Sequence, residues 1–75
     1  MDTQELVTSN RMVGSDGWSL LLDNVKMLND PDYEIICRAL NIPPTTDAWT
    51  LAGYLQRYYW SEVNAAFSAA GRSLN

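Results

Sequence analysis

The side chains that most often carry out catalysis are scarce in this chain. It contains no histidine, which removes the commonest general base and the commonest metal ligand. Cys37 is the single cysteine, so neither an intramolecular disulfide nor a zinc site built from several cysteines can form. Catalytic triads that need a histidine are excluded for the same reason. The composition therefore predicts that the chain is not an enzyme and holds no cofactor and no metal.

Glu62 is a carboxylate that falls within an apolar helical sector. A buried carboxylate is costly unless it is paired, so we expect Glu62 either to reach the surface or to pair with a cation such as Arg38. A catalytic role would require a raised pKa and a second acid or base beside it, which the sequence does not place there. Cys37 lies on an apolar stripe and is expected to be a small buried side chain rather than a nucleophile.

The charge of the chain restricts the class of partner. It has nine acidic and five basic side chains, and its formal net charge is −4. Binding to a phosphate backbone depends on clustered cations that release counterions. Here the cations are dispersed singly along the chain, as Arg11, Lys26, Arg38, Arg57 and Arg72. The charge pattern therefore argues against nucleic acid as a partner.

Three features predict where the protein resides. The start of the sequence is acidic and has no apolar run of signal-peptide length. No stretch reaches the ~18 uninterrupted apolar residues of a membrane span. A lone cysteine favours a reducing compartment. We expect a cytoplasmic protein that makes no contact with membranes.

Helices must position these side chains, since no alternating run of β-branched residues predicts a strand. Residues 1–14 are mostly polar and are expected to form a flexible N-terminal arm, and residues 15–75 to form a single helical domain. A first helix is predicted from a cap at Ser15 or Asp16 to about Asn29. Its apolar stripe at helical spacing consists of Trp18, Leu21, Leu22, Val25 and Leu28.

A short second helix is predicted over residues 31–40. Asp30 can accept hydrogen bonds from free amides, and Pro31 fits the first helical turn without losing a bond. The helix is expected to end at residues 41–44, because a residue before proline is pushed out of the helical region. Its apolar stripe consists of Tyr33, Ile36, Cys37 and Leu40.

A long third helix is predicted over residues 47–70, with a cap at Thr45 or Thr46 and a left-handed stop at Gly71. The expected fold class is therefore all-α, a small three-helix domain in which two short helices pack on a long C-terminal helix. The long helix carries two apolar rows, and two short helices cannot cover both. The second row consists of Trp49, Gln56, Trp60 and Phe67.

The second row predicts a binding surface, because aromatic side chains dominate the energetics of protein interfaces. Arg57 is expected at its rim beside Gln56. The preferred interpretation is a small acidic protein–protein interaction module, a regulator or inhibitor that docks on a larger cytoplasmic protein or forms a homodimer. The acidic side of the first helix would steer it toward a basic surface. The sequence leaves open which partner binds, the oligomeric state, and whether the arm folds on binding.

A second interpretation comes from residues 38–43, which read Arg-Ala-Leu-Asn-Ile-Pro and precede Trp49 by a few residues. This order resembles the turn of a helix-turn-helix, where a small residue and a Leu-x-Ile turn come before a capped recognition helix. The resemblance implies a DNA-binding transcriptional regulator. Its DNA contacts would come from Thr45, Thr46, Thr50 and Arg57. Because these positions lack clustered cations, DNA binding is the alternative and not the preferred function.

Overall fold

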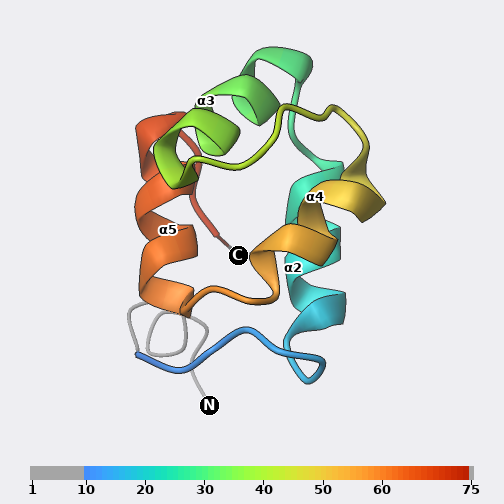
Figure 1. Ribbon diagram of the computed structural model, residues 1–75, viewed down its shortest axis with the longest axis vertical. Coiled ribbons are helices and arrows are strands. Elements are labelled where there is room, and N and C mark those ends of the chain that lie inside the picture. Colours follow the sequence, from blue (N-terminus) through green and yellow to red (C-terminus); the bar gives the residue numbers. More distant parts are fainter. Residues whose placement is uncertain (1–9, 75) are drawn as a thin grey trace.

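The computed structural model describes residues 10–74, and four helices occupy most of this range (Figure 1). Their bounds are Trp18–Lys26 for α2, Asp30–Leu40 for α3, Ala48–Leu55 for α4 and Trp60–Ala69 for α5. No strand forms among the described residues, so the predicted all-α class is confirmed. The prediction of three helices with a long C-terminal helix is wrong, because the segment expected to be one helix forms α4 and α5.

The long helix is interrupted because its backbone groups are taken by the N-terminal segment. In a continuous helix the amide of Trp60 would donate to the carbonyl of Gln56. Instead the Trp60 amide donates to the carbonyl of Arg11 (2.8 Å), and the Gln56 carbonyl accepts from the amide of Gly14 (2.8 Å). The apolar spacing continues through the break, which is why the sequence pattern predicts one helix.

Helix α5 begins with a cap that uses Glu62. Tyr59 is extended, with ψ near 150°, and its amide donates to Oε1 of Glu62 at 3.0 Å. This contact satisfies a backbone amide that the first turn would leave free. Glu62 is exposed, as expected, and Arg38 pairs with Glu34 (2.9 Å), not with Glu62.

Part of the predicted N-terminal arm lies in the described range. Residues 1–9 are outside the described residues. Met12 pairs with Tyr59 in an isolated antiparallel bridge, and the amide of Val13 donates to the carbonyl of Tyr58 (2.9 Å). Val13 is only 2% exposed and belongs to the core. The segment just before α2 is therefore built into the fold.

The helices pack as two pairs, α2 on α4 and α3 on α5. Figure 1 shows α2 and α5 on opposite sides, with α3 across one end and α4 in front of α2. The apolar stripes predicted for the first two helices face the core. The buried apolar residues of the core are Val13, Leu21, Leu22, Val25, Tyr33, Ile36, Cys37, Ile42, Leu51, Ala52, Leu55, Trp60, Val63, Ala66 and Phe67. None of the described helices is long and apolar enough to cross a membrane.

The end of α5 is fastened to the beginning of α3. Gly71 adopts φ of +73°, which confirms the predicted left-handed stop. The guanidinium of Arg72 then donates through Nε (3.0 Å) and Nη2 (2.9 Å) to Oδ2 of Asp32. The same oxygen accepts from the amide of Asn29 (2.9 Å), which caps α3. Asp32 is buried, so this ion pair closes the α3–α5 pair at one end.

Candidate functional site

The structure divides the predicted partner-binding residues between a surface and the core. Trp60 and Phe67 are each only 1% exposed and pack inside the domain. Trp49, near the start of α4, is 58% exposed. Gln56 is half-buried and Arg57 is exposed, and both follow directly after α4. The break between α4 and α5 causes this division, since Trp49, Gln56 and Arg57 lie in or directly after α4, whereas Trp60 and Phe67 lie in α5.

Helix α4 differs from the other described helices because it contains no charged side chain. One side of it, Leu51, Ala52 and Leu55, is fully buried. The other side points outward at positions 49, 50, 53 and 54, and we call these four residues the outer face of α4: Trp49, Thr50, Gly53 and Tyr54. A helix that is apolar all round is normally buried, whereas α4 has no charge and still exposes Trp49 and Tyr54. The outer face of α4 is therefore an uncharged surface that the isolated fold leaves uncovered.

The beginning of α4 is fixed by Asp47. Its Oδ2 accepts from the amide of Thr50 (2.8 Å) and from the hydroxyl of Thr50 (2.7 Å). These hydrogen bonds from Thr50 hold the pKa of the Asp47 carboxyl below its usual value. Burial, the larger cause, and the nearby carboxylates of Asp47 and Asp30 raise the pKa of the Tyr33 phenol. The cap leaves the hydroxyl of Thr50 satisfied, so the outer face presents little unmet hydrogen-bonding capacity.

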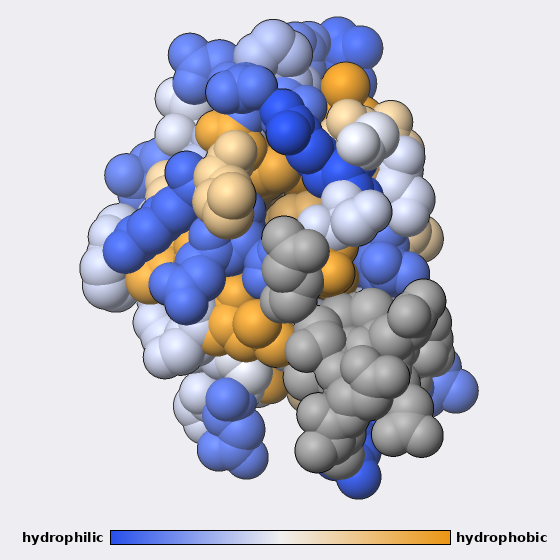
Figure 2. Space-filling model, turned by 180° about the vertical axis from the view of Figure 1, so that it is seen from behind, coloured by the Kyte–Doolittle hydropathy of each residue, from blue (hydrophilic) through white to orange (hydrophobic). Residues whose placement is uncertain are grey.

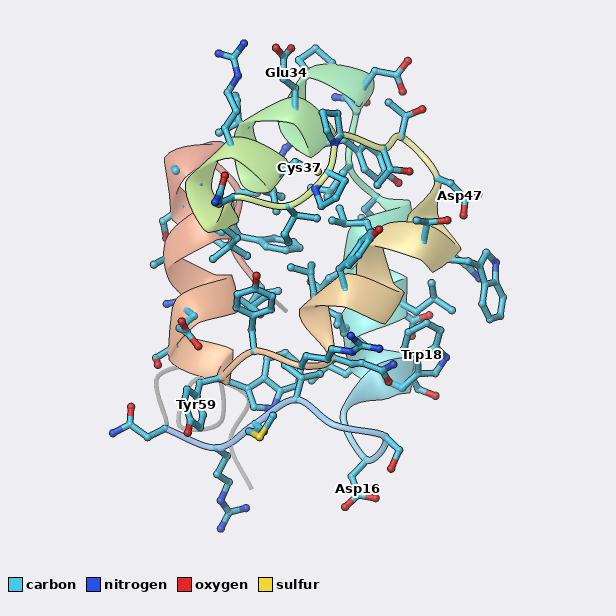
Figure 3. The ribbon with its side chains drawn as sticks, viewed as in Figure 1. Asp16, Trp18, Glu34, Cys37, Asp47 and Tyr59 are labelled. Carbon is cyan, nitrogen blue, oxygen red and sulfur yellow. The ribbon has the colours of Figure 1, made fainter. Side chains whose placement is uncertain are left out.

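Trp49 is held in place by α2. The rings of Trp49 and Trp18 are 5.8 Å apart at a tilt of 48°, and Nζ of Lys26 lies 5.6 Å from the Trp49 ring centroid. Figure 3 shows Trp18 at the start of α2 and Asp47 just before α4 on the same side of the molecule. The tilted ring pair and the cation both favour one position of the indole. Trp49 is thus an exposed side chain that is already oriented.

Gly53 lies in the middle of α4 without an evident role in the fold. A glycine inside a helix costs about 1 kcal/mol relative to alanine. Its φ is not positive, and a Cβ at this position would have no heavy atom within 4 Å. Neither backbone geometry nor crowding within the chain therefore requires glycine here. Its absence of a side chain does allow another backbone to approach closely.

A shallow hollow of about 280 Å³ runs along this side of the molecule. Its lining joins three outer-face residues to the two predicted rim residues, namely Thr50, Gly53, Tyr54, Gln56 and Arg57. Arg57 makes no ion pair within the described part of the chain. The hollow is open and uncharged apart from Arg57, which suits a protein surface better than a small charged ligand.

A larger hollow of about 660 Å³ lies between α3 and the segment before α4. Cys37 is one of its lining residues and is a buried free thiol, as expected for a small buried side chain. Its rim carries Asp30 and the exposed Glu34–Arg38 ion pair, whose charges are already solvated or matched. Within residues 10–74 no group of three or more acidic or cysteine side chains is placed to hold a metal ion.

On the opposite side of the molecule the described residues form no comparable uncharged face. Figure 2 shows apolar areas there that are interrupted by hydrophilic side chains. A hollow of about 270 Å³ between α2 and the end of α5 includes the polar side chains of Asn24 and Arg72. Arg72 is already paired with Asp32. This side therefore resembles an ordinary solvated surface.

The residues of the DNA-binding interpretation lie at and after the connection from α3 to α4. Thr46, Thr50 and Arg57 are exposed and Thr45 is half-buried. Helix α3 packs on α5 and helix α4 packs on α2, so the two helices of the presumed motif do not form the main contact with each other. DNA binding stays an untested prediction.

Comparison with known protein families, with curated proteins and with solved structures finds no match to any of them. The outer face of α4 must therefore be interpreted from its own geometry and chemistry.

Sequence reasoning missed Gly53 and Tyr54 and the support that Trp18 and Lys26 give to Trp49. A signal was present, because residues 48–56 contain no charge and include a glycine at a helical position. The assumption of one long helix hid it, since the aromatic residues of α4 and α5 were placed on the same row. With α4 treated as a separate helix, positions 49, 50, 53 and 54 fall opposite Leu51 and Leu55.

Proposed function

We propose that this chain is a non-enzymatic protein-interaction module that docks through the outer face of α4. The observation that carries the proposal is a helix without charged side chains whose solvent-facing side holds an exposed tryptophan. Covering such a face removes apolar surface from water, and the face itself contains no charge to desolvate. Gln56 and Arg57 form the polar rim.

The energetic anchor of this interface is Trp49. Tryptophan, tyrosine and arginine are the residue types most enriched among side chains that dominate binding energy, and all three occur here as Trp49, Tyr54 and Arg57. Because Trp18 and Lys26 already orient the indole, little side-chain freedom is lost on binding. The proposed action is steric, as a regulator or inhibitor that covers a partner surface, in the cytoplasm, where the free thiol of Cys37 stays reduced.

Site-specific photo-cross-linking tests the proposal. A photoreactive phenylalanine analogue replaces Tyr54 in one variant and Ile35 in a control variant, in cells that make the protein. The two side chains are equally exposed, at 37% and 39%, but Ile35 lies on α3. We expect a discrete protein adduct from position 54 and none from position 35.

Trp49→Ala in the position-54 variant supplies the second half of the test. Loss of the anchor should weaken docking by about 2 kcal/mol, roughly thirtyfold, and remove most of the adduct. Far-ultraviolet circular dichroism checks that the helices remain. Equal adducts from positions 54 and 35, or an adduct that survives Trp49→Ala, would rule out docking through this face.

A further inference from the structure

We infer that the surface docked on the outer face of α4 is the same face of a second copy of this chain, with the two α4 helices antiparallel. The inference rests on the proposed function and specifies its partner. In the resulting two-fold dimer Trp49 packs over Gly53 of the second copy on one flank of the interface, and Tyr54 packs over Thr50 of the second copy on the other flank.

The arrangement of the outer face is symmetric about the middle of α4. A two-fold interface uses the same patch on both copies, so each contact between two different positions occurs twice. In antiparallel helices that overlap fully, position 49 lies at the height of 54 of the second copy, and position 50 at the height of 53. Because residues advance by about 100° around a helix, Trp49 and Gly53 share one flank of the face and Thr50 and Tyr54 share the other, and the two-fold axis keeps each flank on its own side. These four positions are the complete outer face, and each aromatic member meets a small member of the second copy, Trp49 over Gly53 and Tyr54 over Thr50. The face is therefore complementary to itself in this orientation.

Side-chain size supports the same orientation. The two central positions are the small residues Thr50 and Gly53, and the two outer positions are the aromatic residues Trp49 and Tyr54. Small residues at the crossing let the two backbones approach closely, and a Cβ-free position with open space above it is available at Gly53. The aromatic side chains then close the interface at both ends.

The charges at the ends of α4 also match in this orientation. Two copies with a formal net charge of −4 each repel one another, so a stable contact needs a neutral face. Asp47 is exposed just before α4, and Arg57 is exposed just after it. Antiparallel overlap brings Asp47 of each copy beside Arg57 of the other. A parallel overlap would place like charges together.

Exchange of these charges tests the inference by sedimentation equilibrium over a range of protein concentrations. We expect the unmodified chain to dimerise. Asp47→Arg and Arg57→Asp should each raise the dissociation constant of the homodimer about tenfold, because each creates two like-charge contacts. An equimolar mixture of the two variants should form a heterodimer about as tight as the original dimer, because both rim contacts are again between opposite charges.

Two controls keep the test decisive if Asp47→Arg disturbs the helix cap. Asp47→Asn keeps a capping side chain and removes only the charge, so it should weaken the dimer less than Asp47→Arg. Mixed Thr50→Cys and Gly53→Cys chains should form an intermolecular disulfide faster than either variant alone. Cys37 is buried and does not compete.

Three results would overturn the inference. In the first, the unmodified chain stays monomeric up to about 1 mM. In the second, the Gly53→Glu variant still dimerises. In the third, Thr50→Cys alone forms the disulfide faster than the mixture does. A monomer whose position-54 variant still gives a specific adduct with a different protein would refute the second copy as partner and leave the proposed function standing. Absence of any adduct from position 54 would refute both.

Discussion

Helices α4 and α5 come from one uninterrupted apolar pattern, yet the fold uses them differently. Trp60 opens α5 and is 1% exposed, whereas Trp49 lies in the first turn of α4 and is 58% exposed. Both helices bury one side against a neighbouring helix, α5 on α3 and α4 on α2. The outward side of α5 carries Glu62 and polar residues, while the outward side of α4 carries no charged side chain. Apolar spacing therefore predicts which residues could share a buried row, and the position of a backbone break decides which of them are buried.

The largest expected difference is between the two tryptophans. Trp60→Ala removes a fully buried indole and leaves a cavity, so it should lower the free energy of unfolding by about 3–5 kcal/mol. Trp49→Ala removes an exposed ring and its contact with Trp18, which should cost about 1 kcal/mol. Urea denaturation of both variants measures the difference. Similar losses would show that the assignment of one ring to the core and the other to the surface is mistaken.

The next effect concerns the ion pair between Arg72 and Asp32, which joins the end of α5 to α3 and has no counterpart at α4 in the part of the chain that the structure describes. Asp32→Asn removes the charge of a buried carboxylate whose Oδ2 lies 2.9 Å from Nη2 of Arg72. The loss of this ion pair should destabilise the fold by about 1–2 kcal/mol. Glu34→Gln breaks the exposed pair with Arg38 and is the matched control, with an expected cost of about 0.5 kcal/mol or less. Thermal melts of the two variants would contradict this if the exposed pair mattered as much as the buried one.

A smaller change in stability, of opposite sign in the two helices, is expected when glycine is exchanged for alanine in α4 and alanine for glycine in α5. Gly53→Ala in α4 should stabilise the monomer by about 0.5–1 kcal/mol, because the added methyl meets nothing. Ala65→Gly at an exposed position of α5 should destabilise it by about as much. Denaturation at low protein concentration isolates the monomer. If Gly53→Ala lowered stability, the space above Gly53 would be needed within the chain itself.

The smallest expected effect is the pH dependence of the α4 cap. Hydrogen bonds from Thr50 lower the pKa of Asp47 in the folded chain below its ordinary value of 3.8. The stabilisation is therefore fully present above that value and is lost as the pH falls through the lower, folded-state pKa. Asp47→Asn should show a shallower loss of stability below pH 3.8 than the unmodified chain. Identical acid profiles for the two proteins would assign the loss to other carboxylates.

Much of the fold could be predicted from the sequence. The apolar stripes of the first two helices and the left-handed stop at Gly71 follow from local spacing and backbone preference. The break between α4 and α5 could not be predicted this way, because it depends on hydrogen bonds from residues more than forty positions earlier in the chain, such as that between Gly14 and Gln56. Local patterns contain no information about such a partner.

The candidate site was predictable only in part for the same reason. Trp49 and Arg57 could be selected as binding residues from residue type alone. Trp60 and Phe67 have the same chemistry, and only the path of the chain after Gln56 separates them from Trp49. Gly53 could not be interpreted before the space above it was known, since a helical glycine is informative only when no neighbour requires it.

Hydroxyl-radical footprinting of the unmodified chain tests most directly whether the outer face of α4 is covered by a second copy of the chain. The oxidation rates of Trp49 and Tyr54 are compared with that of Tyr59, which is 46% exposed and lies outside α4. From dilute to concentrated protein, dimerisation through this face should lower the rates at Trp49 and Tyr54 about tenfold, as both become buried, and leave the rate at Tyr59 unchanged. Oxidation of Trp49 that stays in constant ratio to that of Tyr59 at every concentration would contradict it.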